Sequence, residues 1–296
     1  MDGLTTACQQ TLKAPISCVG IGLHSGLRVS VTLHPAPVDH GIVFRRSDLR
    51  ATIAARFDHV ADARLATTLG IGGARVGTVE HLMAALSGSA IDNVLVELDG
   101  PELPIHDGSA APWMFLLDCA GVAVQPEPRR VIDVLRRVRV KDGAAWAELA
   151  PAEAHDGLEL DVSIDFAAAA IGRQSAQLCL TGNAFRHQIA RARTFALAED
   201  IAALREAGLA QGGSLENAVV VDGGRVLNPG GLRMVDEFAC HKLLDAIGDL
   251  ALAGPLRACF RAHRSGHALH NRLLRALFAD RAAWREVTLG EQRVAA

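Results

Sequence analysis

Hydrophobic and polar residues alternate along the first part of the chain and then follow a helical period. Alternation predicts strands, and apolar positions recurring every three or four residues predict helices. In chain order we expect a strand pair within residues 14–34, a strand at 41–44, a helix from an N-cap at Thr78 to Gly88, a strand at 93–98 and a helix at 112–120.

The same order returns after a proline-containing segment at residues 125–128. Prolines interrupt helices and central strands, so this segment is the expected boundary between two domains, residues 1–126 and 127–296. Beyond it the pattern predicts strands at 131–140, 145–149 and 158–164, a helix at 185–194, a helix at 236–253, a strand at 256–263 and a final helix at 267–277. We therefore expect a duplicated α+β architecture.

Composition limits the choice of partner. The chain has 296 residues, half of them hydrophobic, and a net charge of only −3 without a long basic run. A small molecule is a better expected partner than nucleic acid. The cysteines lack C-x-x-C spacing, and neither a signal peptide nor an apolar run of ~20 residues is recognisable. These features predict a cytoplasmic protein with reduced thiols and no membrane span.

The strongest chemical signal lies in the segment 236–253. His241 and Asp245 are four residues apart, so a helix projects them from one face, where they can hold one metal ion. Such a pair is more often a surface pair. Here the helix is largely apolar, and Asp249 lies one turn further along the same stripe. Buried polar groups are costly unless paired or metal-bound, which favours a metal site.

Two adjacent residues at the start of another predicted helix could complete that site. His81 would be a third ligand and Glu80 a base for a water molecule at the metal, as in a hydrolytic zinc site with one open position. The pattern is not H-E-x-x-H, and Gly77 excludes the inverted form H-x-x-E-H. The usual peptidase families are therefore disfavoured.

His267 follows a glycine turn at the start of the last predicted helix. It could simply satisfy the end of that helix. If Asp249 contacts it, however, the negative charge would raise the pKa of the imidazole and produce a cationic acid beside the metal.

Several motifs together resemble one family, the UDP-3-O-acyl-N-acetylglucosamine deacetylases, which are zinc amidases of the lipid A pathway. The resemblance runs in order from about Thr11 to Val287. It is carried by the segments Gly77–Leu82, Ile91–Asn93, Pro104–Pro112, Ala190–Phe195, His241–Asp249 and Ser265–Leu269.

The resemblance implies a division of labour at the site. One zinc ion per chain would be held by His81, His241 and Asp245, although metal availability in the cell can favour ferrous iron. Glu80 would act as general base. The remaining implied roles are a cationic His267 that stabilises the oxyanion and protonates the leaving amine, Asp249 behind it, and polar groups of Thr194 and Lys242 around the reacting carbonyl.

The family's fold is also implied: two domains, each a sheet packed on two helices, joined so that the helices lie between the two sheets. An insert at about 198–232 would form a passage for the acyl chain of the nucleotide-sugar substrate. A small local core would explain its candidate residues equally well: Ile201, Leu204, Leu209, Gly212, Gly213, Ser214, Ala218 and Val220. Phe195, Asp200 and Arg264 match positions near the glucosamine and nucleotide. His24 and His59 resemble substrate-side positions but could be surface or turn residues.

Some features depart from the family pattern, and other functions remain open. Arg264 stands where a lysine is common, and a lysine expected within 142–146 is absent, so other groups could bind the diphosphate. Ala66 replaces a cysteine found in some relatives. The alternatives are another zinc amidase, a catalytically silent nucleotide-sugar binding protein, and a structural zinc protein, which the cysteine spacing argues against. We expect a monomer, and the preferred acyl-chain length is not predictable from these motifs.

Overall fold

The alternating N-terminal residues form a sheet in the computed structural model, which describes residues 7–152 and 157–289. On β3 the inward-facing residues Val29, Val31 and Leu33 are buried and their neighbours are exposed or partly exposed, as alternation requires. The strand order is β2 (Ile16–Ile21), β3 (Arg28–Pro35), β9 (Val94–Leu98), β4 (Ile42–Arg46) and β5 (Ala51–Ala54).

Smaller elements complete this half of the chain. A 3₁₀ turn spans Phe57–His59, and an antiparallel sheet contains β6 (Val60–Asp62), β7 (Thr68–Ile71) and β8 (Ala74–Val76). The helices are α1 (Glu80–Gly88) and α2 (Ala111–Ala120). Strand β1 (Cys8–Leu12) pairs with β10 (Val122–Pro128), which runs through the predicted boundary at residue 126; the division into two domains stays a prediction.

The second half of the chain forms another mixed sheet. Its central strand β19 (Leu256–His263) pairs in parallel with β14 (Leu158–Asp165) and β11 (Arg130–Val134), and antiparallel with β13 (Ala145–Ala150). Strands β12 (Val138–Asp142), β15 (Arg173–Cys179) and β20 (Trp284–Thr288) lie at its edges. The helices are α3 (Gly182–Ala184), followed by a π-helical turn (Phe185–Ile189), then α5 (Glu237–Leu250), extended by a 3₁₀ turn (Ala251–Ala253), and α6 (His267–Ala279).

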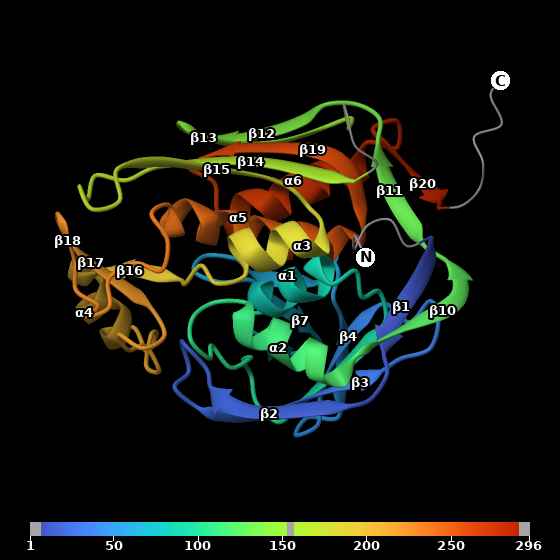
Figure 1. The fold of residues 1–296 in the computed structure, drawn as a ribbon, viewed down its shortest axis with the longest axis horizontal. Helices are drawn as coiled ribbons and strands as arrows, with labels where there is room; N and C mark the ends of the chain where they lie inside the picture. Colours follow the sequence, from blue (N-terminus) through green and yellow to red (C-terminus); the bar gives the residue numbers. More distant parts are fainter. Residues whose placement is uncertain (1–6, 153–156, 290–296) are drawn as a thin grey trace.

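The helices lie between the two sheets, which confirms the predicted α+β class (Figure 1). The insert lies to one side of these layers. It contains β16 (Phe195–Leu197), α4 (Ala198–Glu206), β17 (Val219–Asp222) and β18 (Arg225–Val226), with β16 and β17 parallel as in a β-α-β unit. In the parts of the chain that the structure covers, no helix is long and apolar enough to cross a membrane.

Several predicted boundaries were wrong. Thr78 does not cap α1; Val79 holds the N-cap position, and the Thr78 hydroxyl instead donates to Glu102. The expected strand 131–140 is broken into β11 and β12, and the helix expected at 185–194 ends at Ile189. Strands β15 and β20 were not predicted, because edge strands with a polar outer face carry little hydrophobic signal.

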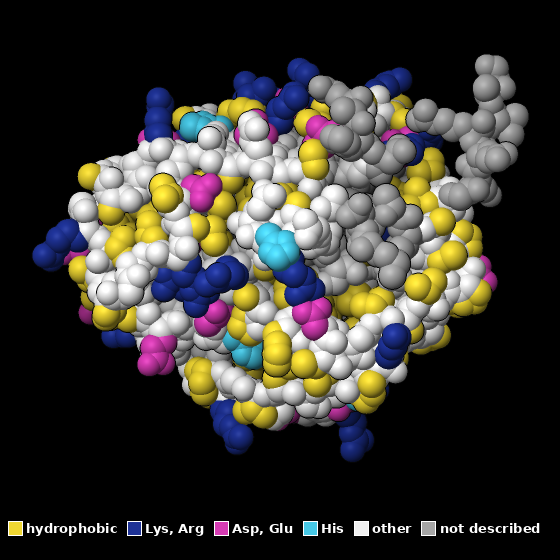
Figure 2. Space-filling model, in the orientation of Figure 1, with side chains coloured by type: hydrophobic (Ala, Val, Ile, Leu, Met, Phe, Trp, Pro, Cys, Tyr) yellow, Lys and Arg dark blue, Asp and Glu magenta, His cyan; other side chains and the backbone are white. Residues whose placement is uncertain are grey.

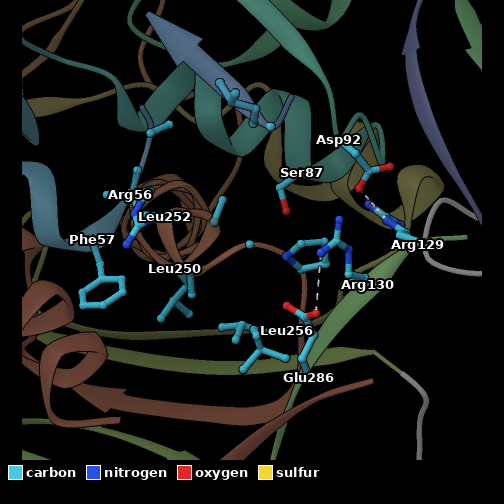
Figure 3. A pocket seen from close by; sticks show the side chains of 18 of the residues that line it. Arg56, Phe57, Ser87, Asp92, Arg129, Arg130, Leu250, Leu252, Leu256 and Glu286 are labelled. Carbon is cyan, nitrogen blue, oxygen red and sulfur yellow. Dashed lines mark hydrogen bonds and ion pairs between the residues drawn. The ribbon is translucent and has the colours of Figure 1, made fainter. Parts of the chain in front are cut away.

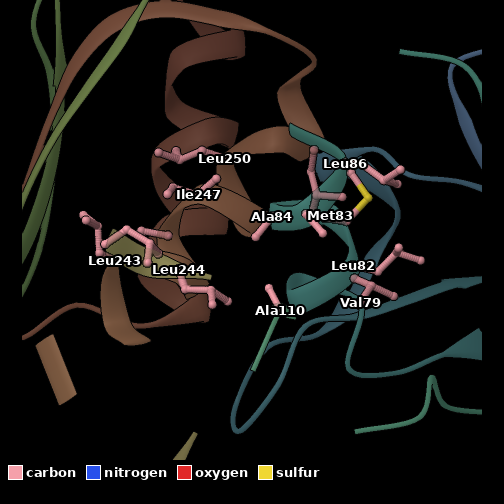
Figure 4. Packing of buried hydrophobic residues seen from close by; sticks show 14 of the residues in the cluster. Val79, Leu82, Met83, Ala84, Leu86, Ala110, Leu243, Leu244, Ile247 and Leu250 are labelled. Carbon is pink, nitrogen blue, oxygen red and sulfur yellow. The ribbon is translucent and has the colours of Figure 1, made fainter. Parts of the chain in front are cut away.

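Helices α1 and α5 cross in the centre of the molecule. Figure 4 shows Leu82 and Met83 of α1 on one side and Leu244 and Ile247 of α5 on the other, all fully buried. At the closest approach a Cβ added to Gly248 would lie 2.0 Å from the backbone oxygen of Glu80. Only glycine permits this spacing, and the crossing brings residues 80 and 81 against the middle of α5.

Replacing Gly248 by alanine is expected to lower the free energy of unfolding by about 3 kcal/mol, because the new methyl group forces two packed backbones apart. Equilibrium denaturant unfolding measures the change. Gly230→Ala is the matched control: its added Cβ has no neighbour within 4 Å, so stability should stay within ~0.5 kcal/mol of wild type. Equal stability of the two variants would contradict the packing argument.

Candidate metal centre and active site

His81, His241 and Asp245 meet where α1 and α5 cross. Each offers one possible ligand atom, these atoms lie within 4.8 Å of one another, and all three side chains are buried. The Nε2 atoms of His81 and His241 lie 3.7 Å and 3.3 Å from Oδ1 of Asp245. The structure thus brings together the three predicted ligands, from opposite halves of the chain.

The protonation state of this cluster suits a metal ion. Nδ1 of His241 lies 3.1 Å from the carbonyl oxygen of Ala192, which can only accept, so Nδ1 carries the proton and Nε2 is left as a ligand. Burial lowers the pKa of both histidines, that of His81 to about 3, which leaves neutral imidazoles. Although burial opposes it, the pKa of Asp245 is lowered by His241, Lys242 and its other neighbours. Two neutral imidazoles and a carboxylate are the donor set of many catalytic zinc sites.

Glu80 lies next to this cluster at the start of α1. Its Oε2 accepts a hydrogen bond of 3.0 Å from the backbone N–H of Thr67. Burial raises the pKa of the carboxyl group to about 7. A carboxylate of that pKa can take up a proton near neutral pH, which is the property a general base requires.

Asp249 also lies beside the cluster, where its carboxylate binds two histidines. Its Oδ2 accepts hydrogen bonds from Nδ1 of His267 at 2.8 Å and Nδ1 of His270 at 2.7 Å, and Thr67 donates its hydroxyl to Oδ1 at 2.5 Å. Burial by itself would lower the pKa of His267, but the charge of Asp249 raises it to about 9. The predicted contact between Asp249 and His267 is confirmed. Sequence reasoning missed Thr67 and also His270, although the latter lies one turn after His267.

The cluster lies in a cavity of about 290 Å³ that opens beside the insert. Lys242 reaches it from α5, with Nζ 2.9 Å from Oδ2 of Asp245 and 5.5 Å from the centre of the Phe195 ring. Thr78 also lines it, with a left-handed φ of 56°, a strained conformation for a β-branched residue. The predicted site residues on the cavity wall are Glu80, His81, Thr194, Phe195, Asp200, His241, Lys242, Asp245 and His267.

Other predicted residues lie outside this cavity. Arg264 lines a neighbouring one, together with Lys242 and Phe166. Ser214 belongs to a local turn, in which its hydroxyl accepts the N–H of Glu216. Gly212 docks the insert on the first half of the chain: its N–H donates to the carbonyl of Leu23, and a Cβ there would meet the oxygen of Gly22 at 2.3 Å.

Of the candidates for the acyl passage on α4, Leu204 lines the cavity and Ile201 does not. Two further histidines, His24 and His59, resemble substrate-side positions in the sequence. His24 lines the cavity, and among the described residues its ring nitrogens have no hydrogen-bond partner. His59 instead binds the carbonyl of Ala54 through Nδ1, as a turn residue does.

A larger cleft, of about 640 Å³, lies between the two halves near the C-terminal end of α5. Figure 3 shows Leu250, Leu252 and Leu256 lining it, with arginines at its edge. Arg129 is paired with Asp92 at 2.7 Å and Arg130 with Glu286 at 3.8 Å. Among the described residues, neither of the two groups of possible metal ligands lines this cleft, so the smaller cavity is the candidate active site.

An α+β layered fold with buried His81, His241 and Asp245, an adjacent carboxylate and a cationic histidine has the arrangement used by metal-dependent hydrolases. Sequence comparisons identify the family. A model of the UDP-3-O-acyl N-acetylglycosamine deacetylase family matches residues 9–279, and the chain belongs to this family.

Individual relatives agree along nearly their whole length. The UDP-3-O-acyl-N-acetylglucosamine deacetylase of Acidithiobacillus ferrooxidans is 49% identical over 290 residues, which cover 96% of this chain and 94% of the relative. The proteins of the same name from Anaeromyxobacter dehalogenans and Idiomarina loihiensis are 51% and 48% identical, covering 94% and 97% of this chain and 90% and 95% of their own.

Proposed function

We propose that this protein hydrolyses the acetamide of UDP-3-O-acyl-N-acetylglucosamine, releasing acetate and UDP-3-O-acyl-glucosamine, a step of lipid A biosynthesis. We also propose that the reaction depends on one zinc ion per chain, held by His81, His241 and Asp245. The observation that carries the proposal is the buried cluster of these three side chains with Glu80 and His267 beside it, in a chain of the deacetylase family.

Amide hydrolysis needs a nucleophile at neutral pH and stabilisation of the charge that forms on the carbonyl oxygen. Zinc, when bound, lowers the pKa of a water molecule to about 7 and polarises the carbonyl. Glu80 would take a proton from the attacking water. Its pKa of about 7, raised by burial, suits that step at neutral pH.

His267 acts on the oxygen and on the leaving group. Asp249 fixes the imidazole through Nδ1 at 2.8 Å and keeps it cationic, which leaves Nε2–H directed away from Asp249. This N–H donates to the developing oxyanion and then gives its proton to the leaving amine. The hydroxyl of Thr194 and the ammonium of Lys242 are further donors at the cavity wall.

The substrate's nucleotide and acyl chain leave the cavity in different directions. Phe195 and Asp200 bind the glucosamine side, and Arg264, in the adjoining cavity with Lys242, binds the nucleotide side. The insert borders the acyl passage, with Leu204 on the cavity wall. Hydrophobic side chains are exposed on the side of the molecule that carries the insert, and charged side chains of both signs lie among them (Figure 2).

Acetate release from UDP-3-O-acyl-N-acetylglucosamine by the purified protein tests the reaction. UDP-N-acetylglucosamine, which lacks the acyl chain, is the matched control and should react far more slowly, because it leaves the passage empty. Equal rates would indicate an amidase of another specificity. Binding of the acylated substrate without acetate release would instead indicate a silent nucleotide-sugar binding protein.

A further inference from the structure

A single peptide group lies between two side chains of α5. The bond between Ala192 and Arg193 presents its carbonyl oxygen to Nδ1 of His241, at 3.1 Å, and its N–H to Oε1 of Glu237, at 3.0 Å. Glu237 and His241 are four residues apart and therefore project from the same face of the helix. The peptide thus connects a carboxylate in the first turn of α5 to the imidazole one turn later.

Glu237 is held in one orientation. Its side chain has no exposed surface, and each oxygen accepts two hydrogen bonds. Oε1 accepts from the backbone N–H and Nε of Arg193; Oε2 accepts from Nη2 of Arg193 at 3.0 Å and from the backbone N–H of Arg233 at 2.7 Å. Although burial raises the pKa of Glu237, the hydrogen bonds from Arg193 and the backbone lower it overall, so the group is ionised. A buried carboxylate with four donors has little freedom to turn.

We infer that Glu237 is a positioning residue for the metal ligand His241 and acts on it through the peptide between Ala192 and Arg193. Because a peptide group is planar and its N–H and C=O point in opposite directions, fixing the N–H also fixes the carbonyl that receives His241. The negative charge on Glu237 also polarises the peptide and makes the carbonyl a better acceptor. A stronger bond at Nδ1 holds the ring in place and increases the basicity of Nε2.

Residues of the first half of the chain also contact the segment around this peptide. Thr194 donates its N–H to the carbonyl of Gly108 at 2.8 Å, and Arg233 forms an ion pair of 2.9 Å with Asp107. Gly108 lies so close to Asn217 that an added Cβ would be 2.0 Å from its carbonyl oxygen. Nη1 of Arg233 also donates to the carbonyl of Arg191 at 3.1 Å, so the residues on both sides of the peptide are held in place. This leaves Glu237 to set the direction of the carbonyl.

The Glu237→Gln variant tests this inference, which rests on the proposed metal site. The amide keeps the shape of the side chain but removes the charge, so the zinc dissociation constant should rise by about tenfold or more. Competition with a chromophoric chelator measures it without reference to activity. Asp133→Asn is the matched control, since Asp133 is also a buried carboxylate that accepts from two arginines, Arg257 and Arg285, but on β11. Its zinc affinity should equal that of wild type, even if its thermal stability falls.

The Arg193→Lys variant distinguishes the contribution of the peptide from that of the Arg193–Glu237 ion pair, because it removes the guanidinium but keeps the backbone N–H. We expect lower stability and near wild-type zinc affinity. If Glu237→Gln does not fold, Glu237→Asp replaces it; the carboxylate is then one methylene too short to reach the N–H, and zinc should again bind more weakly.

Unchanged zinc affinity in a folded Glu237 variant would overturn the inference and leave the residue a purely structural role. An equal loss of zinc affinity in Glu237→Gln and Asp133→Asn would also overturn the inference. Failure of the proposed metal site gives a different result: the wild type and the His81→Ala variant would then bind zinc equally.

Discussion

Acetate release is expected to fall to background when a chelator removes the metal from the purified protein, and to return when one equivalent of zinc per chain is added. The reason lies in the cluster of His81, His241 and Asp245. It offers three donors and is buried between two helices. Without a metal, water in the cavity keeps a pKa near the bulk value of about 15.7, so Glu80 can deprotonate it only very slowly. The loss should therefore be nearly complete rather than partial.

The control for this experiment is the fold of the stripped protein. Circular dichroism should stay unchanged, because the crossing of α1 and α5 is held by packed hydrophobic residues. The free energy of unfolding should rise when zinc is added, by about 2.7 kcal/mol at a free zinc concentration of 100 times the dissociation constant. Full activity in metal-free protein would disprove the proposed mechanism. Recovery with ferrous iron under anaerobic conditions would show that the site accepts either metal.

The Glu80→Gln variant is expected to lose about 10²–10⁴-fold in kcat while it keeps its fold and most of its zinc. The amide oxygen can still accept the N–H of Thr67, as Oε2 does at 3.0 Å, so the start of α1 should stay in place. An amide cannot take up a proton from water, however. Because Glu80 is not among the three ligand residues, zinc affinity should change far less than kcat.

Steady-state kinetics and zinc titration on the same preparation measure both quantities. Glu148→Gln is the matched control: Glu148 is also a buried glutamate, but it lies on β13 and faces Arg137 and Arg139. It should lower stability and leave kcat close to wild type. Normal turnover in Glu80→Gln would remove the assignment of Glu80 as general base.

Much of the candidate site was predictable because some of its geometry is local. His241 and Asp245 are four residues apart on an apolar helix, which places both on one face whatever the rest of the chain does. The glycine turn before His267 likewise marks the start of α6. The relative placement of residues in such motifs can be predicted from the sequence because the α-helix has a fixed period.

Groups supplied by backbone atoms or by distant segments were not predictable. The carbonyl of Ala192 and the N–H of Thr67 carry no side-chain signature, yet they orient His241 and Glu80. Thr78 has the residue type of an N-cap, but its hydroxyl binds Glu102, a tertiary partner that sequence spacing does not reveal. Tertiary hydrogen bonds outweighed the local preference there.

By itself, the sequence determined the α+β class, the family, and the chemical types available for catalysis, because periodicity, motif order and residue identity are properties of the chain alone. Only the tertiary structure decided which groups meet. It closed the distance between His81 and Asp245, 164 positions apart by their residue numbers, and paired Asp249 with His270 as well as His267. It also raised the pKa of Glu80 by burial and that of His267 by contact with Asp249. Burial and through-space charge depend on the packing of α1 against α5, which no local pattern specifies.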